Sequence, residues 1–335
     1  MSEKRRSIQF IKNPSLPIIL EGWEGNPHDG RRFIDPTKEF DKKFRDVLRW
    51  KLGKNPKKEE KKLDTWQLPT VTDKEFLTRK DNCIVWLGHA SFFIHYNGVQ
   101  LMTDPVFYNL SALFKRHSKL PCAVSDFENI HYVLLSHCHR DHCDQRSLKT
   151  LHKCNPFHLL SSLGGGALVS RWLPELKSTE FGWFQQMKLP GTDITITHLP
   201  TQHWSNRFPW DMNETLWGSY MIECGDTAIF FGGDSGYSDY PKRIATLFPK
   251  IDFAMIGIGS YDPDFMMRSA HTNPQEAVEV IRDLGAKHFI PMHYGTFDMT
   301  NEPLGEPLKL ITKLNESHQI PSQLHLAIPG EMILF

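Results

Sequence analysis

Three histidines and an aspartate crowd into one short segment of the chain. It reads Ser136-His137-Cys138-His139-Arg140-Asp141-His142 and follows the apolar run Tyr132–Leu135, so one turn can fold the four side chains toward a point. Imidazole is the commonest protein metal ligand. Nitrogen and carboxylate ligands without thiolate suit zinc, and manganese, iron or nickel accept the same geometry. The segment therefore predicts a metal site, with a histidine-rich surface loop as the alternative.

Three further candidate ligands lie downstream, each after an apolar run. His203 follows Leu199-Pro200-Thr201-Gln202, Asp234 follows Phe230-Phe231-Gly232-Gly233, and His293 follows Phe289-Ile290-Pro291-Met292. Each stands where the backbone turns out of the core, as a loop-borne site on a rigid scaffold requires. Taken singly, each is more often structural than a ligand. Asp234, for example, can simply close a turn, as Asp commonly does. The residues alone leave both interpretations open.

Short apolar runs and helical patterns separate these candidates. We expect strands at 83–87, 91–96, 99–103, 132–135, 194–197, 219–223, 228–231, 253–258 and 288–291, and helices at 145–152, 239–247, 274–284 and 307–315. Asn97-Gly98 favours a type I′ hairpin turn, and Asn273-Pro274 is a typical helix start. Strands first, then strands and helices mixed, indicate sheets packed together and covered by helices.

Composition excludes several classes of protein. The chain of 335 residues has 39 Lys and Arg against 39 Asp and Glu, so no global basic field attracts nucleic acid. No signal-peptide pattern and no run of about 18 apolar residues is visible. The six cysteines form no CxxC pair, which fits reduced thiols. We expect a cytoplasmic protein, with peripheral contact on the inner face of a membrane as a further expectation.

The first 80 residues differ in composition from the rest of the chain. They are rich in proline and charge, and residues 51–62 carry six Lys against two Glu with little apolar periodicity. We interpret this run as a solvated arm, with a phosphate- or membrane-facing patch as the alternative. The predicted organisation is an N-terminal extension over 1–80, packing on or preceding the core, and a catalytic domain over 81–335.

Several motifs together resemble the metallo-β-lactamase superfamily. The order His-x-His-x-Asp-His, then His, Asp and His, is that superfamily's pattern. The branch of N-acylphosphatidylethanolamine-hydrolysing phospholipase D is similar over about Trp86 to Pro307, through these segments: Trp86-Leu87-Gly88-His89-Ala90-Ser91, Thr103-Asp104-Pro105-Val106-Phe107, Gln202-His203-Trp204, Leu216-Trp217-Gly218, Gly232-Gly233-Asp234-Ser235-Gly236-Tyr237, Asn273-Pro274-Gln275-Glu276-Ala277 and Asn301-Glu302-Pro303-Leu304-Gly305-Glu306-Pro307. The resemblance implies an α+β fold, an αββα sandwich of two mixed sheets flanked by helices.

The resemblance also implies a binuclear site with two Zn²⁺ per chain. One ion would be held by His137, His139 and His203, the other by Asp141, His142 and His293, with Asp234 bridging both. Asp104 would accept a hydrogen bond from a ligand histidine and fix its tautomer.

The implied chemistry is hydrolysis of a phosphodiester, with Asp141, Asp234 and His271 as catalytic residues. Two cations that share a water lower its pKa toward about 7, which supplies hydroxide at neutral pH. His271, just before the predicted helix at 274–284, is the candidate proton donor and also a candidate substrate contact. The remaining candidate substrate contacts are His89, Trp204 and Phe107, of which His89 can instead buttress the site.

The substrate is less well defined than the metal chemistry. We expect an N-acylphosphatidylethanolamine or related phospholipid, cleaved to phosphatidic acid and an N-acylethanolamine-type alcohol. The aromatic segment 107–114 and its cationic flank 115–117 could rest in a lipid interface, or pack on their own domain. The alternative function is a soluble metallo-hydrolase of a small phosphorylated lactone or ester. A di-iron protein is disfavoured because such relatives carry Glu where this chain has His139, and a tRNA nuclease because no basic stripe is present. A homodimer is expected by resemblance alone.

Overall fold

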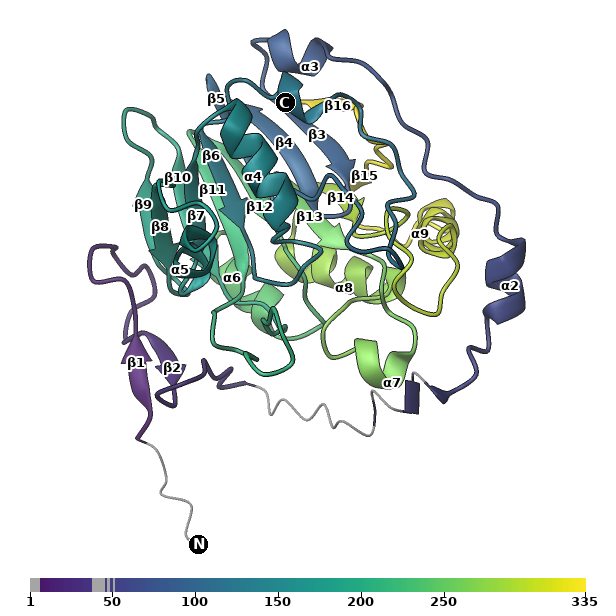
Figure 1. Cartoon of the computed structure of the whole chain (residues 1–335), viewed down its shortest axis with the longest axis horizontal. Coiled ribbons are helices and arrows are strands. Elements are labelled where there is room, and N and C mark those ends of the chain that lie inside the picture. The colour runs from purple at the N-terminus through teal and green to yellow at the C-terminus, as the bar shows by residue number, and fades with distance from the viewer. Residues whose placement is uncertain (1–6, 38–45, 47–48, 51) are drawn as a thin grey trace, which may run out of the picture.

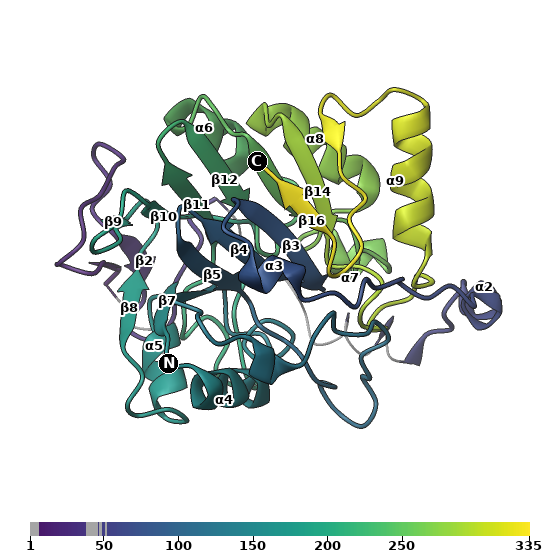
Figure 2. The ribbon, with the colours of Figure 1, turned by 90° about the horizontal axis from the view of Figure 1, so that it is seen from above.

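Two seven-stranded mixed sheets pack face to face in the computed structural model, which describes residues 7–37, 46, 49, 50 and 52–335 (Figures 1 and 2). In spatial order the first sheet contains β16 (Met332–Leu334), β3 (Cys83–Gly88), β4 (Ser91–Tyr96), β5 (Val99–Thr103), β6 (Tyr132–Leu135), β7 (His158–Ser162) and β8 (Ser178–Phe181). The second contains β15 (Gln323–Leu324), β14 (His288–Met292), β13 (Phe253–Gly257), β12 (Thr227–Phe231), β11 (Ser219–Cys224), β10 (Thr195–Leu199) and β9 (Gln186–Lys188).

Helices cover the outer face of each sheet. Figure 2 shows α4 (Gln145–Cys154) and α5 (Gly165–Ser170) against the first sheet, and α6 (Tyr240–Leu247), α8 (Pro274–Leu284) and α9 (Glu306–Glu316) against the second. The shorter elements are α2 (Lys58–Leu63), α3 (Glu75–Thr78), the 3₁₀ turn Val124–Asp126, α7 (Asp264–Met267) and the hairpin of β1 (Gln9–Ile11) and β2 (Asn26–His28). The predicted αββα sandwich of two mixed sheets is confirmed.

The alternation of side chains along β3 explains why the first sheet is apolar on both faces. Ile84 and Trp86 join the core between the two sheets. Val85 and Leu87 point the other way and pack in a second core that includes Leu148 of α4. Successive side chains of a strand face opposite sides of its sheet, so a strand covered on both sides reads as a continuous apolar run. Burying each such side chain stabilises the fold by about 1.5–3 kcal/mol.

The direction of the strands brings the candidate ligands to one edge of the sandwich. In the first sheet β3 and β5 are both antiparallel to β4, and β6 is parallel to β5. In the second sheet β10 and β12 are both antiparallel to β11, and β13 and β14 continue parallel to β12. The carboxyl ends of β3, β5 and β6 therefore share one edge, and those of β10, β12 and β14 share another. Loops at these ends can meet where the two sheets face each other.

The N-terminal residues lie on the sandwich. The backbone N–H of Ile19 donates to the carbonyl of Phe184 at 2.9 Å, beside β9. Most of residues 52–62 are exposed, as a solvated arm requires, but Lys57 and Lys61 also form ion pairs with Asp262, Glu306 and Asp298, which tie the run to the rest of the chain. Within the predicted extension 1–80, residues 1–6, 38–45, 47, 48 and 51 lie outside the described residues. The boundary at residue 80 stays a prediction.

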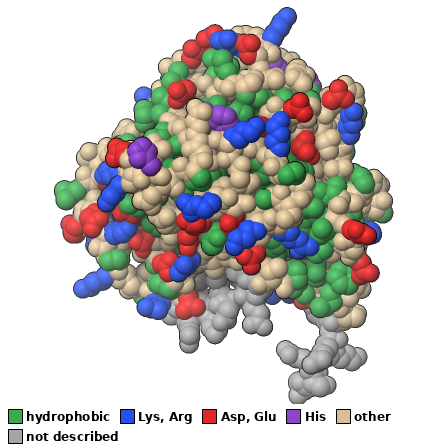
Figure 3. All heavy atoms as spheres, turned by 180° about the vertical axis from the view of Figure 1, so that it is seen from behind, with side chains coloured by type: hydrophobic (Ala, Val, Ile, Leu, Met, Phe, Trp, Pro, Cys, Tyr) green, Lys and Arg blue, Asp and Glu red, His purple; other side chains and the backbone are tan. Residues whose placement is uncertain are grey.

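The surface is mixed in charge. On the face seen in Figure 3, Lys and Arg side chains alternate with Asp and Glu. Within the described residues, no helix combines the length and the apolarity that crossing a bilayer requires.

Candidate metal centre

The histidine-rich segment forms a tight turn between β6 and α4. The backbone N–H groups of His142 and Cys143 both donate to the carbonyl of His139, at 3.2 and 2.8 Å. Asp144 then caps α4, its carboxylate accepting the backbone N–H of Ser147 at 2.8 Å. The turn places the imidazoles of His137 and His139 so close that Nε2 of the first lies 2.8 Å from Nδ1 of the second. The turn therefore brings the side chains of the predicted ligands together, as their close spacing in the sequence predicts.

The three ligands predicted downstream lie against this turn. His203 follows β10, Asp234 follows β12 and His293 follows β14. One carboxylate oxygen of Asp234 lies 3.1 Å from Nε2 of His142, and the other lies 3.2 Å from Nε2 of His293. The first oxygen is also 3.9 Å from Nε2 of His137 and 3.8 Å from Nε2 of His203. Asp234 thus stands at the centre of the site.

The donor atoms form overlapping groups, two of which contain four residues each. Within each group the nitrogen and oxygen atoms lie within 4.8 Å of one another. The first contains His137, His139, His203 and Asp234, and the second contains His89, Asp141, His142 and His293. Every ion pair recorded for the Asp234 carboxylate is with an imidazole. Two buried groups of imidazoles and carboxylates, with one carboxylate in contact with both, fit a pair of divalent cations.

Outer hydrogen bonds fix the tautomers of two of these imidazoles. Nδ1 of His142 donates to Asp104 Oδ2 at 2.7 Å, which turns Nε2 toward Asp234. Asp104 is fully buried and also accepts from the hydroxyl and the backbone N–H of Ser136, at 2.5 and 2.8 Å. Nδ1 of His203 donates to the carbonyl of Ala270 at 3.0 Å. Such outer acceptors orient metal-ligating histidines.

Burial and charge set the protonation of the site. Burial by itself raises the pKa of the Asp234 carboxyl, but the His142 and His293 imidazoles outweigh it and hold the pKa well below its usual range. Burial lowers the pKa of His137 and His203 well below the usual imidazole value. Neutral imidazole and ionised carboxylate are the forms that bind cations. For His293, burial is outweighed by Asp234 and Asp141, which raise the pKa to about 9. Burial is likewise outweighed at His142, where Asp234, Asp141 and Asp104 raise the pKa well above its usual value.

The backbone is strained at three residues of the site. His89, Asp104 and His293 have φ angles of 54°, 32° and 63°. This left-handed region is uncommon for residues other than glycine, and such strain clusters where the surrounding structure fixes a functional geometry. Each of the three residues follows a strand, so the strain re-aims the chain at the edge where the sheets meet.

A pocket of about 280 Å³ opens beside the two groups. Its lining includes the site residues His139, Asp141, Asp234 and His271, together with Trp204, whose ring centre lies 4.4 Å from that of His139. The other lining residues are Trp50, Arg140, Asn206, Ser260, Met266, Met267, Met299 and Thr300. Three of the thirteen lining residues are thus methionines.

Two predicted substrate contacts face the pocket and two do not. His271 lines it, with Nδ1 3.7 Å from the Asp234 carboxylate, and Trp204 lines it as well. His89 is buried, with Nε2 3.0 Å from Asp141 Oδ2 and its ring 4.0 Å from that of His293, so it lies with the second donor group and not in the pocket lining. The placement of Phe107 is corrected: it is buried and stacks on Phe127 at 5.9 Å, in the core beneath α4.

Several pocket residues were not singled out from the sequence. Arg140 had a local signal, since it stands between two predicted ligands and brings a cation to the pocket. Trp50 and Met299 had none, because each is far in sequence from the metal motifs.

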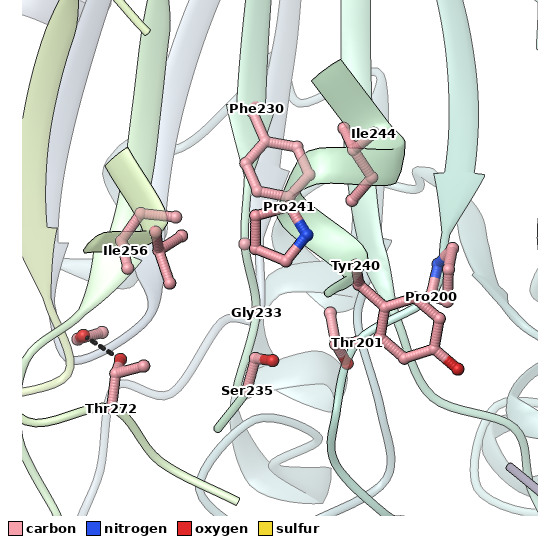
Figure 4. Close-up of a pocket in the computed structure, with 13 residues that line it drawn as sticks. Pro200, Thr201, Phe230, Gly233, Ser235, Tyr240, Pro241, Ile244, Ile256 and Thr272 are labelled. Atoms are coloured by element: carbon pink, nitrogen blue, oxygen red, sulfur yellow. Dashed lines mark hydrogen bonds between the residues drawn. The ribbon is translucent and has the colours of Figure 1, made fainter. Parts of the chain in front are cut away.

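A second, smaller pocket lies behind the Asp234 turn. It holds about 30 Å³ and is lined mainly by apolar side chains, among them Phe230, Pro241 and Ile244 (Figure 4). Thr272 borders it and donates its hydroxyl to the carbonyl of Gly257 at 2.7 Å. This pocket is far smaller than a typical ligand site. It contributes packing behind Asp234.

Comparison with known proteins agrees with this geometry. The profile of the β-lactamase superfamily domain matches residues 100–294. A protein of Caenorhabditis elegans, N-acyl-phosphatidylethanolamine-hydrolyzing phospholipase D 1, is 31% identical over 294 residues, which are 82% of each chain. The mitochondrial N-acyl-phosphatidylethanolamine-hydrolyzing phospholipase D of Saccharomyces cerevisiae is 29% identical over 76% of this chain and 56% of its own.

Solved structures share the fold at low sequence identity. A possible metal-dependent hydrolase from Veillonella parvula superposes with a TM-score of 0.60 at 14% identity, over 76% of this chain and all of its own. CmlA, a diiron β-hydroxylase from Streptomyces venezuelae, gives 0.57 at 17% identity, over 77% and 55%. At these identities the likeness shows that the fold is shared.

Proposed function

The chain belongs to the metallo-β-lactamase superfamily, in the branch of the N-acyl-phosphatidylethanolamine-hydrolysing phospholipases D, and is a hydrolase of that superfamily; on this premise we propose that it is a binuclear zinc phosphodiesterase. Its proposed reaction adds water to N-acylphosphatidylethanolamine, or a related phospholipid, and releases phosphatidic acid and an N-acylethanolamine-type alcohol. The observation that carries the proposal is a pocket lined both by members of the His and Asp groups and by three methionines.

The side chains can be assigned roles in that reaction. Two divalent cations, when bound, supply a water of lowered pKa and offset charge on the phosphate oxygens. Asp104 keeps His142 in the tautomer that binds through Nε2. His271 lies beside Asp234 at the pocket wall, where it can give a proton to the departing alcohol oxygen as the phosphorus–oxygen bond breaks. Arg140 brings positive charge to the same pocket, which favours an anionic phosphodiester.

We also propose peripheral contact with a phospholipid surface. Phe208 and Trp210 are exposed and stacked at 4.9 Å, and the Arg140 guanidinium lies 5.4 Å from the Phe208 ring. Phe265, in α7 next to the pocket residue Met266, is exposed too. Aromatic side chains beside a cation suit the boundary of a bilayer. Leu113, in the segment named from the sequence, is also exposed. A homodimer and a cytoplasmic location stay predictions.

The experiment offers the purified, zinc-loaded protein three substrates. N-palmitoylphosphatidylethanolamine in mixed micelles is followed by mass spectrometry of phosphatidic acid, and bis(p-nitrophenyl) phosphate and a small phosphorylated lactone are assayed beside it. We expect phosphatidic acid to form, and the Asp234→Asn variant to form none. Fast opening of the lactone with no phosphatidic acid would replace this function with that of a small-ester hydrolase.

A further inference from the structure

A segment from the N-terminal part of the chain is fastened beside the pocket and contributes Trp50 to its lining. We call residues 49, 50 and 52–66 the strap; it contains α2 and runs beside α9 in Figure 1. The indole N–H of Trp50 donates to Asn301 Oδ1, and the side-chain amide of Asn55 donates to the carbonyl of Asn301, both at 3.1 Å. These bonds join segments about 250 residues apart in the sequence.

Two lysines of the strap reinforce this attachment. Nζ of Lys57 lies 2.5 Å from Glu306 Oε1 and 3.4 Å from Asp262 Oδ2, and these three side chains are less than 30% exposed. Lys61 pairs with Asp298. Partly buried ion pairs that form a network hold better than isolated surface pairs. The lysine-rich run therefore fixes the strap to the segments that border the pocket.

The far end of the strap is anchored by close packing. The Trp66 ring lies against Gly295 and Gly305, where an added Cβ would meet it at 3.0 Å. Asp64 accepts the backbone N–H of Gly305 at 2.9 Å. Any side chain at Gly295 or Gly305 would push Trp66 outward. Both ends of the strap are thus seated on residues 295–306.

The segment that contacts the strap also positions the loop that carries Ser260, a residue of the pocket lining. The buried carboxylate of Glu302 accepts the backbone N–H groups of Ser260 and Asp262, at 2.6 and 3.2 Å. The backbone N–H of Asn301 donates to the carbonyl of Asp262 at 2.9 Å. Ser260 lines the pocket and lies just before α7. One set of residues therefore sets the strap and this loop relative to each other.

The contacts bring Trp50 into the lining of the pocket, which includes three methionines. Trp50 lines the pocket together with Met266, Met267 and Met299, and the neighbouring Arg49 guanidinium lies 4.5 Å from the Phe265 ring of α7. Methionine side chains adapt to irregular apolar surfaces, and an indole supplies a large flat one. An unbranched alkyl chain is the ligand that such a lining suits.

We infer that the strap completes a subsite for an alkyl chain attached to the phosphate, and that Trp50 is a specificity-determining residue of that subsite. The inference deepens the proposed function and rests on it for the position of the phosphate beside Asp234. The chain would lie along Trp50 and the three methionines. Lys57 and Asn301 are positioning residues, because they act by holding the strap.

Binding tests this subsite without turnover. The dissociation constants of dodecyl phosphate and methyl phosphate are measured by titration calorimetry on the wild-type holoprotein and on Trp50→Ala. We expect dodecyl phosphate to bind about tenfold more weakly to Trp50→Ala, the effect of losing contact with roughly two methylene groups. Methyl phosphate should bind equally to both proteins. Leu63→Ala is the matched control, since Leu63 lies on the same strap but is 80% exposed.

A second variant separates the ring from its hydrogen bond. Trp50→Phe keeps an aromatic surface and loses the N–H that Asn301 accepts. It should retain dodecyl phosphate binding within about threefold of wild type, since the ring supplies the apolar contact. Equal losses for dodecyl and methyl phosphate in Trp50→Ala, or no loss for either, would overturn the inference. If the dodecyl effect appears but wild type makes no phosphatidic acid, the subsite stands and the proposed reaction fails.

Discussion

Replacing Asp104 with asparagine removes one negative charge from behind the metal centre without changing the size of the side chain. The carboxylate is fully buried and accepts three hydrogen bonds, from Nδ1 of His142 and from the hydroxyl and backbone N–H of Ser136. An amide has one acceptor oxygen in place of two. It must therefore turn an N–H₂ group toward either His142 or Ser136, and one of these donors loses its acceptor.

The structure sets the expected size of the effect. The 2.7 Å bond from His142 is charge-assisted when Asp104 is ionised, and losing a bond of this kind costs about 1.5–3 kcal/mol. Outer acceptors of metal-ligating histidines are worth about 10- to 100-fold in metal affinity, or roughly 1.4–2.7 kcal/mol. The two ranges agree. We expect Asp104→Asn to weaken zinc binding by a factor of about 10 to 100.

The assay is a competition titration of the apoprotein against a chromophoric zinc chelator. Asp252→Asn is the matched control, because its carboxylate also accepts a backbone N–H, that of Ala228 at 3.0 Å, but lies just before β13 of the second sheet. That control should bind zinc as wild type does. Wild-type affinity in Asp104→Asn, with the thermal unfolding midpoint unchanged, would refute the role assigned to Asp104.

Three further predictions concern the turn, the pocket and the cations. Gly233→Ala should abolish activity, since its φ is +56° and a Cβ would meet the Gly218 carbonyl oxygen at 2.8 Å beside Asp234. Gly191→Ala, at φ +73° in open space, should only destabilise the fold by about 1 kcal/mol and leave activity unchanged. Thermal melts and the phosphatidic acid assay measure the two effects. Arg140→Ala should raise the KM for an anionic phospholipid about fivefold, because it removes a positive charge from the pocket. The control Arg171→Ala, at an exposed residue, should leave KM unchanged in the same steady-state measurement. Removing divalent cations with EDTA should lower the unfolding midpoint, and Zn²⁺ should restore it, since a ligand at one hundred times its Kd adds about 2.7 kcal/mol to the free energy of unfolding. A midpoint indifferent to EDTA would contradict a structural contribution of the metal.

Much of the fold was readable because its inner strands are covered on both faces. β3, β4, β5 and β6 were predicted to within a residue, since each is an apolar run bounded by turn signals. The hairpin at Asn97-Gly98 has positive φ at both residues, as a type I′ turn requires. Edge strands such as β8 and β9 were missed, because they are short, polar and half-exposed.

The site residues also differ in how well the sequence alone predicts their positions. The turn from His137 to His142 is local, so its spacing alone indicates that these side chains gather. The strap is not local: Trp50 reaches the pocket through Asn301, and no periodicity or motif in residues 49–66 signals that contact. Phe107 shows the opposite error, because nearness in sequence to Asp104 suggested the pocket. The strained backbone at Asp104 directs the chain toward α4, where the Phe107 N–H donates to Ser147 Oγ at 2.8 Å.

The central claim, two metal ions that share one carboxylate, is tested most directly by counting metal per chain. Inductively coupled plasma mass spectrometry of wild type and of Asp234→Asn, both loaded with zinc and freed of excess by gel filtration, gives the two numbers. We predict about two zinc ions per wild-type chain and a clear loss in Asp234→Asn, whose altered side chain contacts imidazoles of both groups. One ion or fewer in wild type, or two retained in the variant, would contradict the account.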